Sequence, residues 1–260
     1  MKKNHQASMN NNLDNCYWCN EKATTREHVP PRCLFPKKKD INFIDNNDYR
    51  QSLITVPSCD KHNTEKSHDD EYLMVCLGSK VGNNDIAFIH TNTKIRRALE
   101  RKPHFFKSAI DDVLHAGDRE FPVQLVYADN ARLMHSFEAI TRALIFHEFN
   151  FRYEGNCSIV SRMFVNPSDR DSTSYLLKSC QALDRERIRW RTQINGESPK
   201  IFTYQFSDMD GLGSFVLALT FYEKTIVYSV MSLLGEKNRE KARILLQPEI
   251  DRFLDGDANN

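Results

Sequence analysis

The sequence "CDKHN", residues 59 to 63, places a cysteine, a histidine and an asparagine within five positions. Two residues separate Cys59 from His62, a spacing at which a tight turn directs both side chains at one metal ion. A second pair with the same spacing, Cys16 and Cys19, occurs upstream in "CYWC". Zinc prefers four tetrahedral N/S ligands. We therefore predict that these four residues bind one structural Zn²⁺, which stabilises a small N-terminal unit.

The remaining cysteines show no such pairing. Cys33 has no partner at short spacing, although it could replace one of the four ligands. Cys76, Cys157 and Cys180 occur in apolar or helical contexts, which favours buried thiols. The cysteines are seven, an odd number, and the first residues contain no apolar signal segment. These features predict a cytoplasmic protein without disulfides.

The segment around these pairs predicts two short strands and a helix. Residues 22–29 and 51–57 are rich in β-branched side chains, which favours strands. The polar stretch between them, residues 36–50, is expected to form a long hairpin loop. Residues 63–77 contain no glycine or proline and many helix-forming residues, so we expect a helix there.

The rest of the chain predicts a mixture of helices and strands. The best helical periodicity occurs at 130–151, where apolar residues recur every three to four positions. Residues 214–234 are strongly apolar, but Glu223 and Lys224 interrupt them, which indicates two strands and a turn rather than a membrane span. Further helices are expected at 94–102, 103–115, 172–187 and 238–254, and further strands at 121–128 and 200–207.

The predicted fold class is therefore α+β, with three parts. Residues 1–15 form an Asn-rich lead-in that we expect to be disordered. Residues 16–82 form the zinc-stapled unit, and residues 90–260 form a mixed α+β domain whose role the sequence does not indicate. The break between the last two is predicted from the Gly/Asn-rich stretch 78–85.

The composition is that of an ordinary globular protein. Apolar residues make up 40% of the chain and charged residues 27%, and the formal net charge is +1. A near-zero net charge argues against a protein that coats nucleic acid through bulk charge. Basic residues nevertheless exceed acidic ones in the first 110 positions, which is compatible with contact to a polyanion.

Two features remain that a structural zinc site does not explain. In "REHVPPR", residues 26 to 32, a Glu-His pair precedes two prolines, which stiffen the chain after the histidine. Asn63 directly follows the second ligand pair. The combination Cys-x-x-Cys, Glu-His-Val-Pro and Cys-x-x-His-Asn resembles the HNH nucleases, or ββα-metal endonucleases. The similarity is to their zinc-stapled branch, which includes phage junction resolvases and many bacterial HNH proteins, and it covers residues 16–80.

The resemblance implies a role for each of these residues. His28 matches the histidine that activates a water molecule for attack on the scissile phosphate. Glu27, at a position where the family often has Asp, and Asn63 match the positions that bind one catalytic Mg²⁺ or Mn²⁺. The last histidine of the motif is not at its usual spacing, so we expect Asp70, or less favourably Glu71, to be the third ligand.

Basic residues near the motif are candidates for contact with phosphates. Such contacts position a nucleic acid without reading its sequence. The alternative for the lysine run is a solvated loop. The candidate residues are Arg26, Arg32, Lys37, Lys38 and Lys39.

The resemblance predicts a metal-dependent endonuclease that hydrolyses phosphodiester bonds in double-stranded DNA. Two alternatives remain: an inactive zinc-stapled module that only binds nucleic acid, and an RNase of the same fold. A role as an anti-phage defence effector, with a partner protein of a defence system, follows only from the resemblance. We also expect a homodimer through residues 90–260, because its long apolar helices could pair, and no membrane partner.

Overall fold

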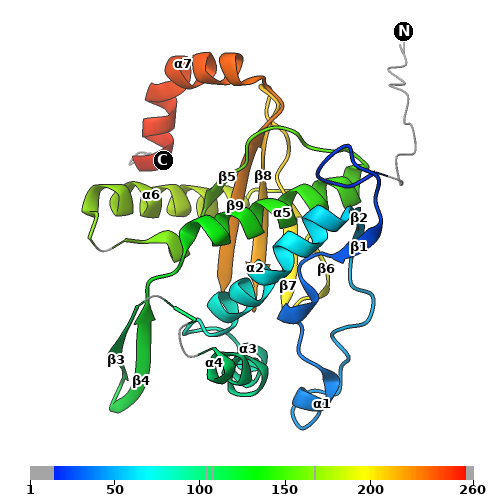
Figure 1. The fold of residues 1–260 in the computed structure, drawn as a ribbon. Coiled ribbons are helices and arrows are strands. Elements are labelled where there is room, and N and C mark those ends of the chain that lie inside the picture. Colours follow the sequence, from blue (N-terminus) through cyan, green and yellow to red (C-terminus); the bar gives the residue numbers. More distant parts are fainter. Residues whose placement is uncertain (1–14, 103–104, 107, 167, 256–260) are drawn as a thin grey trace.

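The computed structural model describes residues 15–102, 105–106, 108–166 and 168–255. The predicted disordered lead-in, residues 1–15, lies outside these ranges except for Asn15. The fold class is α+β, as predicted: helices pack against antiparallel sheets (Figure 1).

The N-terminal part is a two-stranded hairpin followed by a helix, in the predicted order. Glu27 pairs with Val56 across the antiparallel strands. The helix begins at Asp60, three residues before the predicted start, because Cys59 is its N-cap residue. The long connection is not entirely loop, since it contains two short helical turns. The elements are β1 (Thr25–His28), a 3₁₀ turn (Arg32–Leu34), α1 (Lys38–Ile41), β2 (Thr55–Ser58) and α2 (Asp60–Gly78).

The middle of the chain contains helical turns and a protruding hairpin. The predicted helix at 94–102 is present, but the predicted helix at 103–115 is wrong for residues 109–115, which form a strand; positions 103, 104 and 107 lie outside the described residues. Gly117, with φ of +62°, lets the chain reverse tightly and pair the two strands. The elements are α3 (Asp85–His90), a π-helical turn (Thr91–Ile95), α4 (Arg96–Arg101), β3 (Ala109–Ala116) and β4 (Arg119–Val126).

The second half is built on a five-stranded antiparallel sheet with the strand order β5-β9-β8-β7-β6. The apolar stretch 214–234 forms two of these strands, joined by a turn at 222–224, as predicted. The sequence analysis missed β5 and β6. The elements are α5 (Asn130–Phe149), β5 (Ser158–Val160), a 3₁₀ turn (Arg162–Phe164), α6 (Arg170–Arg187), β6 (Asn195–Ser198), β7 (Phe202–Phe206), β8 (Ser214–Phe221), β9 (Thr225–Ser232) and α7 (Glu236–Asp255).

Two helices cover opposite faces of this sheet. On one face, Thr141 of α5 and Ser229 of β9 share a hydrogen bond of 2.6 Å between their hydroxyl oxygens. On the other face, the Tyr228 hydroxyl donates to Asp184 of α6 at 2.6 Å. Because neighbouring residues of a strand point to opposite faces, these two bonds place the sheet between α5 and α6.

Helix α5 also carries the N-terminal unit. Helix α2 lies alongside α5 (Figure 1), and Asp69 accepts a hydrogen bond from Arg132 at 2.6 Å. The Tyr222 hydroxyl donates to the Leu34 carbonyl at 2.8 Å, which joins the sheet to the long connection. One hydrophobic cluster runs through both predicted segments. Within the described ranges, no helix is long and apolar enough to cross a membrane.

Candidate metal centre and active site

The four predicted zinc ligands come together in one cluster. Cys16 and Cys19 lie before β1, Cys59 caps α2, and His62 lies in the first turn of that helix. The potential ligand atoms all lie within 4.8 Å of one another. The knuckle that carries the first pair is joined to β2, because the Tyr17 amide donates to the Pro57 carbonyl at 2.9 Å.

The spacing of these atoms fits a tetrahedral metal ion. With Zn–S bonds of about 2.3 Å and a Zn–N bond of about 2.0 Å, tetrahedral geometry separates two sulfurs by about 3.8 Å and a sulfur from the nitrogen by about 3.5 Å. The Cys19 and Cys59 sulfurs lie 3.8 Å apart. His62 Nδ1 lies 3.6 Å from the Cys16 sulfur and 3.2 Å from the Cys59 sulfur. The cluster can therefore hold a metal ion such as zinc.

The thiols of this cluster do not ionise equally. Burial opposes ionisation of Cys16, but hydrogen bonds from the backbone amides of Cys59, Trp18 and Cys19 outweigh it and lower the pKa of Cys16. Burial and the neighbouring Cys16 raise the pKa of Cys19 to about 11. Several thiolates at this spacing repel one another, so a bound cation is what would allow all three to ionise.

The other cysteines lie outside the cluster. The Cys33 thiol donates to the Asp70 carbonyl at 3.1 Å, which removes the alternative in which it replaces a ligand. Cys180 is buried, as predicted, whereas Cys76 and Cys157 are only partly buried. None of the cysteines forms a disulfide.

Side chains of α5 pack around the metal cluster. The Trp18 ring stacks on the His62 ring, with centroids 5.3 Å apart and planes at 10°. The Arg142 guanidinium lies 5.2 Å from the Trp18 ring. Arg152, just after α5, donates to the Cys19 carbonyl at 3.2 Å. The sequence analysis missed Arg142 and Arg152, because no local pattern links them to a motif more than 120 positions upstream.

Glu27 and Asp70 lie near the buried hydroxyl of Tyr17. Glu27 is only 5% exposed and points from β1 into the interior. Burial, and then the negative charges of Glu27 and Asp70, raise the pKa of Tyr17 well above its ordinary value. Two carboxylates from different elements are thus close enough to act on one phenol. Asp70 lies about two turns after Asn63 on α2. The side chains of residues 65–68, which lie between them, are not among those that the structure describes.

The Asn63 side chain is oriented by a chain of hydrogen bonds. Its Nδ2 donates to the Thr25 hydroxyl at 3.0 Å, and that hydroxyl donates its single proton to the Ser58 carbonyl at 3.1 Å. Thr25 can therefore only accept from Asn63, which fixes the amide with its oxygen directed away from Thr25. Thr25 and Glu27 share one face of β1, since they are two positions apart.

His28 is the last residue of β1, and cations surround it. Burial, and then the positive charges of Arg32 and Arg50, lower the pKa of His28, while Glu27 acts in the opposite direction. The imidazole is therefore neutral at pH 7 and can accept a proton. Arg26, on the same strand, donates to the Thr55 hydroxyl and carbonyl at 3.0 Å each.

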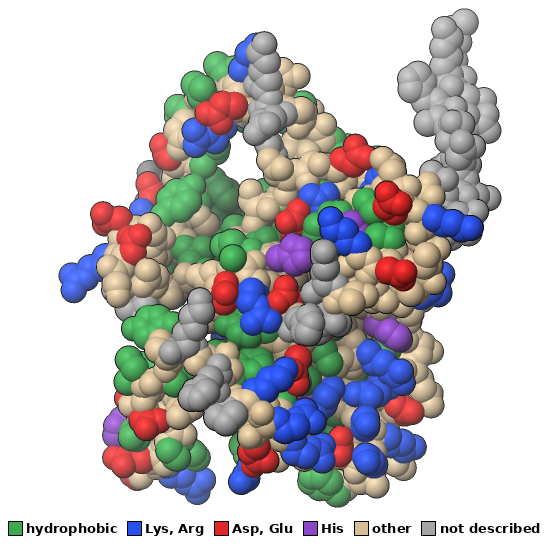
Figure 2. Space-filling model, viewed as in Figure 1, with side chains coloured by type: hydrophobic (Ala, Val, Ile, Leu, Met, Phe, Trp, Pro, Cys, Tyr) green, Lys and Arg blue, Asp and Glu red, His purple; other side chains and the backbone are tan. Residues whose placement is uncertain are grey.

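The predicted phosphate-contacting residues lie on the surface. Arg26, Arg32 and the lysine run 37–39 at α1 are all exposed. Figure 2 shows Lys and Arg side chains gathered in the lower part of the molecule, over α1 and α4. Glu71, the less favoured third ligand, forms salt bridges with Arg101, at 3.8 Å, and with Lys102.

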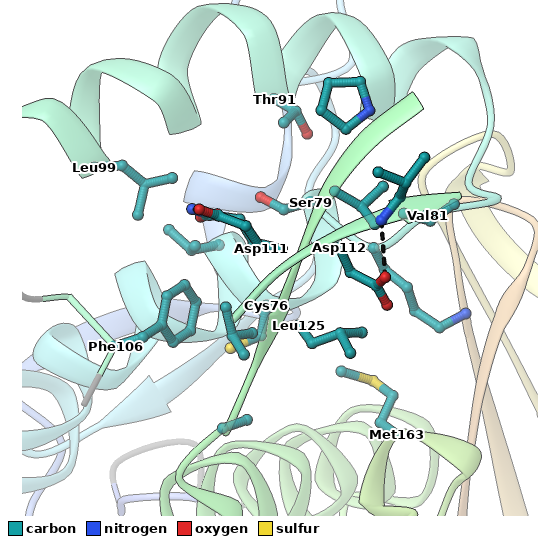
Figure 3. A pocket seen from close by; sticks show the side chains of 18 of the residues that line it. Cys76, Ser79, Val81, Thr91, Leu99, Phe106, Asp111, Asp112, Leu125 and Met163 are labelled. Carbon is teal, nitrogen blue, oxygen red and sulfur yellow. Dashed lines mark hydrogen bonds between the residues drawn. The ribbon is translucent and has the colours of Figure 1, made fainter. Parts of the chain in front are cut away.

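A large cavity lies at the far end of α2 and takes no part in this arrangement. Its volume is about 940 Å³, and its lining includes Cys76 of α2, Ser79 just after that helix and Leu125 of the β3–β4 hairpin (Figure 3). Its lining is mainly apolar and includes none of the predicted site residues. The candidate site residues therefore lie around β1 and the start of α2, not in this cavity.

Comparison of the chain with models of protein families, with curated proteins and with solved structures finds no match. The motif and the geometry of its residues are therefore the basis on which a function can be proposed.

Proposed function

We propose that this protein is a metal-dependent endonuclease of the HNH type that hydrolyses phosphodiester bonds, with double-stranded DNA as its substrate. The observation that carries the proposal is the position of Asn63 directly after the Cys/His cluster, with its amide bonded to the strand that bears Glu27 and His28. A module that only binds nucleic acid needs the cluster but not these three residues.

His28 acts as the general base in this proposal. A water molecule gives a proton to the neutral imidazole, its oxygen forms a bond to phosphorus, and the bond from phosphorus to the 3′ oxygen breaks. The lowered pKa of His28, caused by burial and by Arg32 and Arg50, keeps the base unprotonated near neutral pH. General-base assistance of this kind contributes about 10²–10⁴-fold in rate.

Glu27 and Asn63 supply oxygen ligands for a divalent cation. Mg²⁺ and Mn²⁺ prefer such ligands, and a bound ion would neutralise charge on the phosphate and the leaving oxygen. Asp70 is the proposed third ligand, because it lies on the Tyr17 side with Glu27, whereas Glu71 is engaged by Arg101 and Lys102. The Cys/His cluster has no open position once filled and serves as a structural zinc site.

Incubation of the purified protein with plasmid DNA and with structured RNA tests the activity. We expect DNA cleavage with Mg²⁺ or Mn²⁺, none with a chelator, and loss of cleavage in His28→Ala with unchanged metal content. His147→Ala, a change of an exposed histidine at the C-terminal end of α5, serves as the matched control. Cleavage of RNA alone would favour the RNase alternative. Binding without cleavage under all conditions would favour the inactive module, and wild-type turnover by His28→Ala would exclude the proposed base.

We also propose that the chain forms a homodimer through residues 90–260, which would bring two centres to the two strands of a duplex. Exposed apolar residues support this, because the β3–β4 register puts Ile110 beside Leu125 and Leu114 beside Phe121 on one face. Sedimentation of the full-length protein and of Ile110→Ser/Leu125→Ser should show a dimer and a monomer, respectively. A monomeric full-length protein at micromolar concentration would contradict the dimer. A defence role with a partner protein remains a proposal based on the resemblance.

A further inference from the structure

Helix α4 presents a row of cations for which the sequence analysis gave no role. Arg96, Arg97 and Arg101 are exposed, and Lys102 follows them at the C-terminal end. The Arg97 guanidinium lies 3.7 Å from Asp40 of α1. This contact joins the basic helix to the lysine run of α1, and the two together form the basic region seen in Figure 2. We call residues 37–41, helix α4 and Lys102 the basic face.

The basic face is electrostatically continuous with the surroundings of His28. Lys94, just before α4, donates to the Cys33 carbonyl at 3.0 Å. Arg50 donates to the Phe35 carbonyl at 2.9 Å and 2.7 Å. Both cations therefore lie against the segment that begins at Arg32, four residues after His28, so that the cations are not separated into two patches.

Carboxylates neutralise only part of this charge. Arg96 pairs with Glu100 at 3.0 Å, Arg97 with Asp40, and Arg101 and Lys102 share Glu71. Ion pairs at this exposure contribute little and exchange readily for other anions. Within the described part of the chain, the three lysines of the run 37–39 form no ion pair, so the face keeps a positive excess.

We propose that the basic face binds the phosphate backbone of a nucleic-acid duplex and holds it across the His28 site. This proposal deepens the proposed function and rests on it for the identity of the ligand. Guanidinium and ammonium groups on one exposed face bind phosphates without reading bases, and such binding releases counterions and weakens with salt. The continuity of the charge with His28 favours a nucleic acid over an anionic membrane surface.

Duplex binding by inactive full-length protein tests the proposal apart from cleavage. The parent is His28→Ala without added Mg²⁺ or Mn²⁺, titrated with a labelled DNA duplex and a labelled RNA duplex over a range of salt concentrations. The variant Arg96→Gln/Arg97→Gln/Arg101→Gln should bind DNA at least about 10-fold more weakly at 100 mM salt. The slope of log K against log salt should fall by about 2–3, at about 0.9 for each lost phosphate contact.

A matched control removes three exposed, ion-paired cations from α6 and α7 instead. Lys178→Gln/Arg243→Gln/Arg252→Gln breaks pairs with Asp255, Glu240 and Glu249, at the opposite end of the molecule from α4 (Figure 1). We expect this control to bind with the affinity and slope of the parent. Thermal unfolding of both variants should match that of the parent, because the altered side chains are exposed.

Several results would overturn the proposal: no duplex binding by the parent, equal slopes for parent and α4 variant, or an equal loss in the control. The parent and the α4 variant are also tested with vesicles that contain anionic lipids. If the α4 variant lost binding to these vesicles but not to the duplexes, the face would be a membrane contact, and this result would also overturn the proposal. α4-dependent binding without cleavage by the wild type would retain the basic face and refute the nuclease. Cleavage with α4-independent binding would refute only the basic face.

Discussion

The N-terminal unit, residues 16–82, and the part of the chain that contains the five-stranded sheet differ in what stabilises them. They are called the first half and the second half below. The β1–β2 hairpin pairs only four residues on each strand, and a two-stranded sheet of that size is marginal by itself in water. The sheet of the second half has five strands, with α5 on one face and α6 on the other. We therefore expect the first half to depend on a metal ion in its ligand cluster and on packing against α5 as well as on apolar burial, whereas the second can rely on apolar burial alone.

The ligand cluster is not the only link between the first half and the rest of the chain. Trp18 and Cys19 contact Arg142 and Arg152, which belong to the second half. Loss of the metal should therefore disturb the knuckle and the hairpin most, the exposed side of α5 less, and the sheet least.

Loss of two ligand sulfurs should have the largest effect. It tests whether the disturbance decreases from the hairpin to the sheet. In Cys19→Ser/Cys59→Ser, two of the four donors are lost, and with them a large part of the binding free energy of about 10–16 kcal/mol that a structural zinc supplies. We expect metal content near zero and rapid hydrogen exchange in residues 16–78. Strands β7, β8 and β9 should keep their protection.

Cys157→Ser is the matched control, because this thiol is partly buried but lies outside the cluster. It should retain one metal ion per chain. Full metal content in the double variant would contradict the ligand assignment, and equal loss of protection in the sheet would contradict the difference between the halves.

Truncation in α5 should give a smaller but global effect. Phe137 is fully buried and packs against Phe221 and Phe164, with ring centroids 5.9 Å and 6.3 Å away. Phe137→Ala should cost about 3–5 kcal/mol and should lower the melting temperature of both halves, since α5 packs on both. The metal content of the folded protein should not change. Met134→Ala, at an exposed position of the same helix, should leave the melting temperature almost unchanged.

The metal cluster of the first half was predictable from the sequence, because metal binding constrains the spacing of the ligand residues. Two ligands with two residues between them require a tight turn. The four predicted ligands, Cys16, Cys19, Cys59 and His62, do form one cluster. The strands and helix around them followed from β-branched residues and from the absence of helix breakers. The orienting role of Thr25 could not be read, because a threonine in a strand carries no signal for a partner 38 positions away.

In the second half, most helices and strands were predicted from the sequence, but their arrangement in space was not. Period and composition predicted α5 and the β8–β9 pair, but residues 109–115, which form a strand, were predicted to be helical. A short segment with a few apolar residues is compatible with either a helix or a strand. The turn at Gly117, which pairs β3 with β4, decides between them, and no local pattern predicts it. Contacts of Arg142 and Arg152 with the knuckle depend on how α5 lies in space, which no local pattern reports.

Loss of the Thr25 hydroxyl should have a modest effect confined to the proposed active site. Thr25→Val preserves the shape but removes the acceptor of the Asn63 amide, a hydrogen bond worth about 0.5–1.5 kcal/mol. We expect the Mg²⁺ concentration for half-maximal cleavage to rise about 2–10-fold, with zinc content and melting temperature unchanged. Thr24→Val is the matched control, because that hydroxyl donates to Asp60 at 2.6 Å instead. Equal Mg²⁺ dependence of the two variants would exclude a positioning role for Thr25.

Removal of the Arg32 charge should produce the smallest effect, since Arg32 is exposed and salt screens its field. The positive charge lowers the pKa of His28, so Arg32→Gln should raise that pKa. A base acts only when unprotonated, and the acidic limb of the kcat profile should therefore move to higher pH. Saturating substrate separates this shift from weaker phosphate binding, and Arg189→Gln, on a distant exposed arginine, should not shift the limb. The shift should shrink at high salt. A limb that stays in place at low salt, or moves to lower pH, would mean that His28 is not the group whose ionisation limits the rate.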